Sequence, residues 1–236
     1  MRFVFIDEVE QHQKNPNFFG LGVFIVNSFF YLPLCSDFQG HFTDCGWNKE
    51  IEFKGRYLFS QKGDCDIPID KRIKLIDNMA EVTIAKKNSR CEFLFYYNYQ
   101  KKSKENYLML LAHSLKALGR KEKNQGKNLV SIYYDNTSLV HWKEINEISD
   151  PLLLRKGLFQ VELPCSTSGC HKAAGMIYAD VLAYLKSWDV LSPTANDEQN
   201  ASLFELQPGQ RDKEKLERIK NILLKVQSVT TKEIKK

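Results

Sequence analysis

The stretch RFVFIDE at residues 2–8 decides the interpretation of the fold, because it joins a strand-like run to two acids. Residues 2–6 are a short run of aromatic and β-branched residues, which predicts a β-strand that ends at Asp7. A similar run at residues 129–134 is followed by Asp135. Both acids are therefore expected at the C-terminal ends of strands, and two parallel strands would bring them side by side.

The remaining segments predict alternating strands and helices. Further strands are expected at residues 20–26, 29–34, 50–53, 91–97 and 157–163, and helices at residues 66–87, 103–118, 138–148, 173–188 and 211–226. Pro33 marks the third strand as an edge or a strand end. This order predicts an α/β fold, a mixed sheet flanked by helices.

The domain organisation follows from a change in composition near residue 192. Residues 1–191 are expected to form the α/β domain, and residues 192–210, rich in Asn, Gln, Ser and Pro, to form a linker. Residues 211–236 are expected to form an amphipathic helix and a basic tail. This last segment has nine basic and four acidic residues, a surplus of five that equals the net charge of +5. The simplest interpretation is a solvated helix with a frayed tail.

Composition and chain ends argue against several protein classes. The N-terminus lacks the pattern of a signal peptide, and the longest apolar stretch, residues 23–34, is shorter than the roughly 20 residues of a membrane helix. The six cysteines show no regular framework, which predicts reduced thiols and a cytoplasmic protein. The modest positive charge permits an anionic partner without requiring one.

Two other kinds of site find little support. Cys165, Cys170 and His171 lie close in sequence, but no cysteine pair has the two-residue gap of common zinc sites. The Gly20-Leu21-Gly22 segment lacks the further glycine and the lysine of phosphate-binding loops.

Carboxylates that gather at one edge of a sheet predict a metal site. Acids placed side by side repel one another unless a cation joins them, and hard divalent cations prefer oxygen ligands. Asp180 is a third candidate, because it is a lone acid in a strongly apolar predicted helix and needs solvent, a partner or a metal. The alternative is that Asp180 faces water on an ordinary amphipathic helix.

Four short motifs, at residues 5–8, 51–55, 134–135 and 179–180, together resemble the domain-of-unknown-function 3800 family of bacteria and phages. The resemblance covers about residues 1–190 and implies a ribonuclease H-like fold. It implies that the catalytic metal ligands are Asp7, Glu52, Asp135 and Asp180, with Glu8 as a fifth candidate. The implied cofactor is Mg²⁺ or Mn²⁺, and a role in phage conflict or mobile elements fits the family.

Basic residues occur beside one of these acids. Lys54 and Arg56 follow Glu52 and are the candidates for binding nucleic-acid phosphates. Other lysine groups, near residues 101–104 and 116–127, are interpreted as exposed helix ends and loops.

The sequence departs from the family pattern at three positions. Val9 stands where the family usually has a serine, and Ile177 stands where a glutamine is frequent. The third departure concerns the acid that commonly ends the fourth strand of a ribonuclease H sheet. The strands as predicted put Asn98 at that position, with Asp135 one strand later.

Three hypotheses on function follow. The first is a metal-dependent nuclease that hydrolyses RNA or DNA. The second is a catalytically inactive module of the same fold that binds nucleic acid or a partner protein. The third is an interaction protein in which the apolar stripe of residues 211–226 docks a partner or a second copy.

Overall fold

The computed structural model describes residues 1–10, 15–47, 56–60, 67–84, 91–118, 128–135, 139–167, 174–193 and 196–235. The strand expected at residues 50–53 lies outside these ranges, as do Glu52, Lys54, Cys170 and His171. Arg56 begins a short helix, but its side chain is outside the described part.

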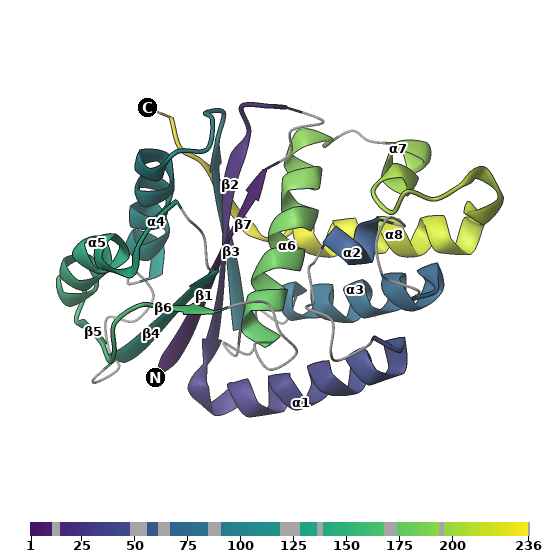
Figure 1. Cartoon of the computed structure of the whole chain (residues 1–236). Helices are drawn as coiled ribbons and strands as arrows, with labels where there is room; N and C mark the ends of the chain where they lie inside the picture. Colours follow the sequence, from purple (N-terminus) through teal and green to yellow (C-terminus); the bar gives the residue numbers. More distant parts are fainter. Residues whose placement is uncertain are drawn as a thin grey trace.

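One mixed sheet forms the centre of the described structure (Figure 1), with seven strands in the order β5-β4-β1-β2-β3-β7 and β6 paired with β4. The strands are β1 (Arg2–Glu10), β2 (Phe19–Asn27), β3 (Cys91–Asn98), β4 (Asn128–Asp135), β5 (Leu158–Gln160), β6 (Cys165–Thr167) and β7 (Thr230–Glu233). The helices are α1 (Ser28–Cys45), α2 (Arg56–Phe59), α3 (Ile69–Ile84), α4 (Lys104–Leu118), α5 (Trp142–Leu154), α6 (Ala174–Leu191), α7 (Asp197–Ser202) and α8 (Lys213–Gln227).

The direction of the strands determines which of their ends meet. β2 runs antiparallel to both β1 and β3, whereas β4 runs parallel to β1. The C-terminal ends of β1, β3 and β4 therefore lie at one edge, which we call the C-terminal edge of the sheet. Three antiparallel strands followed by a fourth beside and parallel to the first is a ribonuclease H-like arrangement. The predicted α/β fold, a mixed sheet flanked by helices, is confirmed.

Helices cover both faces of the sheet (Figure 1). Helices α4 and α5 pack on one face, the α4 face, while α1, α3, α6 and α8 pack on the other, the α6 face. Side chains of a strand alternate between faces. Val4 and Ile6 accordingly enter the core under α4, and Phe5 and Val9 enter the core under α6. None of the helices in the described ranges is long and apolar enough to cross a membrane.

The strand predicted at residues 29–34 is wrong, because these residues begin helix α1. The Asn27 side chain accepts a hydrogen bond from the Phe29 N–H at 3.1 Å and caps the helix. Leu34, Phe38 and Phe42 then recur every four residues and are buried, which is the spacing of a helix face. The aromatic residues at 29–34 look strand-like only in a window too short to contain this repeat.

This correction changes the strand count and the position of Asp135. With α1 helical, residues 91–98 are the third and β4 the fourth of the strands in the described ranges. Asp135 therefore ends the fourth strand, and the third departure from the family pattern disappears. The predicted end of the first strand is also wrong: β1 continues to Glu10, and Asp7 lies within it, paired with Gly22 of β2.

The C-terminal segment packs against the α6-face layer. The segment expected as a linker contains α7 and a 3-10 helix at Pro208–Gln210, and residues of the expected tail form β7, parallel to β3. The apolar side chains of α8 are buried against α3 and α6, as the burial of Ile219, Ile222 and Val226 shows. The apolar face that the third hypothesis assigns to a partner is thus covered by this chain itself.

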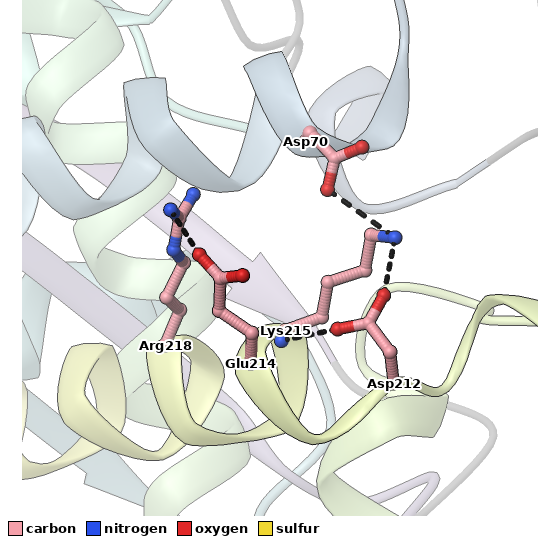
Figure 2. Close-up of polar contacts among 5 residues, drawn as sticks. All are labelled: Asp70, Asp212, Glu214, Lys215 and Arg218. Atoms are coloured by element: carbon pink, nitrogen blue, oxygen red, sulfur yellow. Dashed lines mark hydrogen bonds and ion pairs between the residues drawn. The ribbon is translucent and has the colours of Figure 1, made fainter.

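Charged residues fix the start of α8 (Figure 2). Asp212 caps the helix by accepting the Lys215 N–H at 2.8 Å. The Lys215 ammonium lies 2.6 Å from Asp212 and 3.4 Å from Asp70 at the start of α3, while Arg218 pairs with Glu214 one turn along. Such exposed ion pairs contribute little individually, so α8 is held chiefly by its buried face.

Candidate functional site

Two predicted acids are adjacent where β4 ends beside β1. Ile6 of β1 pairs with Tyr134 of β4, and the next residues along these parallel strands are Asp7 and Asp135. Both lie on the α6 face, because each is two residues after an aromatic side chain of that face, Phe5 or Tyr133. These two rings stack with centroids 5.1 Å apart. The alternation of the strands therefore aims both carboxylates at α6.

Helix α6 comes unusually close to the sheet beside these acids. A Cβ atom added at Gly22, the residue opposite Asp7, would lie 2.7 Å from the Ala183 Cβ and 3.2 Å from the Ala179 carbonyl oxygen. A Cβ atom at Gly175 of the helix would overlap the Phe5 ring. Two glycines, one on the sheet and one on the helix, thus permit the contact. The contact brings the helix turn that carries Asp180 towards Asp7.

Asp7 is a buried acid whose ionisation is further disfavoured by the charges of two other acids. Its side chain is only 8 % exposed, and its pKa is raised well above the usual value, first by burial and then by the charges of Asp180 and Asp135. The Glu8 N–H donates to Asp7 Oδ1 at 2.8 Å and partly offsets this effect. A buried carboxylate beside two others is costly to ionise, and a bound cation would relieve that cost.

The donor chemistry of these acids fits a hard divalent cation such as Mg²⁺ or Mn²⁺, which prefers carboxylate oxygens. However, within the ranges that the structure describes, no group of three or more His, Cys, Asp or Glu side chains is arranged so that it could hold a metal ion. Glu52 lies outside those ranges. The charges of Asp135 and Asp180 thus act on Asp7, but the three side chains do not form a complete set of metal ligands.

Glu8, the fifth candidate, lies on the other side of the sheet. It follows Asp7 in β1, so its side chain points to the α4 face. There it pairs with the Lys102 ammonium, which also lies 3.4 Å from Glu10. The charge of Glu8 is the second cause, after burial, of the raised pKa of Tyr107, a buried residue of α4. The structure therefore separates Glu8 from the three aspartates.

Sequence reasoning missed Gly22 and Lys102. Gly22 belongs to a segment that looks like an incomplete phosphate-binding loop, although a glycine inside a buried strand frequently marks a close approach of another backbone. Lys102 was interpreted as one of several solvated lysines. No local signal in the sequence identifies its partner, because Glu8 is 94 residues away.

The positions that depart from the family pattern have structural roles. Val9 and Ile177 are buried in the α6-face core. Asn98 is also buried, and its side chain exchanges hydrogen bonds with Asn106, whose Nδ2 donates to Asn98 Oδ1 at 3.0 Å. Asn98 therefore anchors the start of α4 and is not a displaced member of the acidic site.

Comparisons with known proteins add little to this picture. No family model matches the chain, and no curated protein matches it by sequence. Among solved structures, the chain is similar to the ribonuclease H2 from Pyrococcus horikoshii OT3, with 11 % sequence identity and a TM-score of 0.40. The match covers 96 % of this chain and 99 % of that one.

Proposed function

We propose that this protein is a divalent-metal-dependent nuclease that hydrolyses phosphodiester bonds of RNA or DNA. The observation that carries the proposal is that Asp7 and Asp135 are adjacent on the parallel strands β1 and β4, while α6, which carries Asp180, packs on Gly22 beside Asp7. The charges of Asp180 and Asp135 both raise the pKa of the buried Asp7. Mutual repulsion in a buried place is a poor arrangement for stability alone. It is expected where a cation completes the site.

Each aspartate has a distinct part in this proposal. Asp7 is the central ligand, because it is the most buried and its pKa responds to both neighbours. Asp135 and Asp180 are proposed to bind the metal on either side of Asp7, and Glu52 is the fourth proposed ligand. When bound, Mg²⁺ or Mn²⁺ supplies the activation of water and the neutralisation of charge on the leaving oxygen. Lys54 and Arg56 are proposed to bind the phosphates of the nucleic acid.

The test is cleavage of labelled RNA and DNA with Mg²⁺ or Mn²⁺, comparing the wild type with Asp7→Asn. We expect the variant to lose cleavage while it keeps its fold, because the substitution removes a ligand charge and almost no volume. Asp150→Asn is the matched control, since Asp150 is exposed on α5, on the other side of the sheet. Cleavage by a clean preparation of Asp7→Asn would contradict the mechanism.

A second candidate function is an inactive module that binds nucleic acid or a partner protein. It is favoured by the lack of a closed set of metal ligands among the described residues and by the diversion of Glu8 to Lys102. Under this alternative, binding of nucleic acid persists with a chelator present and does not need Asp135. Metal-dependent cleavage by the wild type would exclude it.

A further inference from the structure

A small aromatic cluster lies at the C-terminal edge, on the same face as Asp7. Phe18 stacks on Tyr97 at 5.6 Å between ring centroids, and Tyr99 makes T-shaped contacts with both rings, at 5.8 Å from Tyr97 and 6.1 Å from Phe18. Phe18 and Tyr97 belong to the core under α6, which places the cluster on the α6 face. Tyr99 nevertheless remains 46 % exposed. An aromatic ring is thus held in a fixed orientation with part of its surface open to solvent.

The segment that follows Tyr99 is held in place by the buried side-chain amide of Asn106. Asn106 donates to the carbonyl oxygens of Gln100 at 3.3 Å and Lys101 at 3.2 Å, in addition to its bonds with Asn98. The Asn106 N–H in turn donates to Ser103 Oγ at 3.2 Å. Buried polar side chains need every partner, so this network orders the connection between β3 and α4. The rigidity lowers the entropy lost when the exposed ring binds a ligand.

The strand register gives the separation between the cluster and the acids. Val9 of β1 and Tyr97 of β3 both pair with Gly20 of β2, and since adjacent strands are about 4.8 Å apart, they are separated by roughly 10 Å. Asp7 is two residues before Val9 on the same face. Asp7 and Phe95 both pair with Gly22, and Tyr99 is four residues beyond Phe95, so Asp7 and Tyr99 are roughly 17 Å apart. A nucleic-acid strand held at the acids would span this distance to reach Tyr99.

We propose that Tyr99, supported by Tyr97 and Phe18, is a stacking platform for a base of single-stranded nucleic acid. That the bound nucleic acid runs from Tyr99 towards Asp7 rests on the proposed nuclease function. Single strands present the faces of their bases to aromatic side chains, whereas a duplex keeps those faces stacked inside. The proposed substrate class is therefore single-stranded nucleic acid or an unpaired end of a duplex.

Two of the lysines that follow Tyr99 are already engaged in ion pairs. Lys102 is paired with Glu8 and Glu10, and Lys104 is paired with Glu144, so these ammonium groups are already neutralised. Glu233 is also close enough to Tyr97 to raise its pKa. We therefore expect the affinity for single strands to depend only weakly on salt concentration, in contrast to proteins that neutralise many phosphates.

The experiment measures binding of fluorescein-labelled oligouridine, oligothymidine and a blunt duplex by anisotropy, with a chelator present so that nothing is cleaved. Tyr99→Ala is expected to weaken single-strand binding by about 5- to 100-fold, and Tyr99→Phe to retain it. Phe159→Ala is the matched control, because Phe159 is 47 % exposed but lies beside Leu129, at the opposite end of β4. It should bind as the wild type does.

Three results would overturn the platform: no single-strand binding by the wild type, tighter binding of the duplex, or equal affinities of Tyr99→Ala and the wild type. The test is separate from that of the nuclease. Tyr99-dependent binding by a protein that cleaves nothing supports the platform and contradicts the nuclease. Metal-dependent cleavage by a protein whose binding does not depend on Tyr99 supports the nuclease and contradicts the platform.

Discussion

Asp7 pairs across the sheet with Gly22, so the buried carboxylate has a neighbouring position that carries no side chain. Helix α6 packs against this position: the Ala183 Cβ and the Ala179 carbonyl oxygen lie 2.7 Å and 3.2 Å from where a Gly22 Cβ would be. The separation between Asp7 and Asp180 therefore depends on a residue that has no polar group of its own.

Gly22→Ala is expected to displace α6 and weaken the site. The added methyl group would lie 2.7 Å from Ala183, and overpacking of this kind typically costs about 1–3 kcal/mol. We expect a lower melting temperature and a smaller rise in melting temperature on adding Mn²⁺, both measured by calorimetry. Gly40→Ala in α1 is the matched control, since nothing lies within 4 Å of its added Cβ. It should stabilise the protein slightly, as alanine does in helices.

The pH dependence of stability without metal reports on Asp7. Its pKa in the folded protein is raised above the ordinary 3.8, so the folded state binds this proton more tightly than the unfolded state does. The stabilisation is complete below the unfolded pKa and is lost as pH rises through the folded pKa. We therefore expect Asp7→Asn, with chelator at neutral pH, to melt at a higher temperature than the wild type. Between the unfolded and folded pKa of Asp7, the variant should also lose less stability as pH rises.

Calorimetry across a pH series checks this, with each 1 kcal/mol corresponding to about 2–4 °C in a protein of this size. Asp150→Asn should follow the wild type throughout. An Asp7→Asn protein that melts lower than the wild type at neutral pH and without metal would show that the carboxylate is not strained by its neighbours.

The first part of the chain shows how far the sequence predicts this site. The runs before Asp7 and Asp135 predicted two strands whose acids would lie side by side if the strands were parallel, and β1 and β4 are paired in parallel. Hydrophobic spacing also predicted α3, α4, α6 and α8 within a few residues. Local pattern is sufficient there because each element buries a face with a regular period.

The residues that sequence reasoning misplaced depend on features outside the short window in which each was interpreted. The strand expected at 29–34 is a helix because Asn27 caps it and because Phe38 and Phe42, further along, bury its face. The opposite faces of Asp7 and Glu8 follow from the continuation of β1, which depends on pairing with β2. The closeness of Asp180 to Asp7 depends on the packing of α6 on Gly22, which no local pattern specifies.

Asn106→Ala is expected to destabilise the protein by about 1–3 kcal/mol, because it leaves buried polar groups around Asn98 without their partner. The free energy of unfolding from denaturant titration measures the effect. Asn17→Ala, at an exposed asparagine in the turn before β2, should change it by less than about 0.5 kcal/mol. Equal stabilities of the two variants would contradict the network.

Two neighbouring residues of α8 test whether the C-terminal helix belongs to the core. Ile222 is 0 % exposed and Leu224 is 51 % exposed. Ile222→Ala is therefore expected to cost about 2–5 kcal/mol, whereas Leu224→Ala should have a small effect. Denaturant titration measures the free energy of unfolding of both variants. A similarly small effect of both substitutions would mean that α8 does not stabilise the fold.

The most direct test of the account is thermal melting of the wild type and Asp7→Asn during titration with Mg²⁺ or Mn²⁺. A cation that binds the folded state raises its melting temperature with concentration. The account predicts such a rise for the wild type and its loss in Asp7→Asn, with Asp150→Asn behaving as the wild type. The same melting temperature for the wild type at all metal concentrations, or an equal rise in Asp7→Asn, would contradict the proposed metal site at the three aspartates.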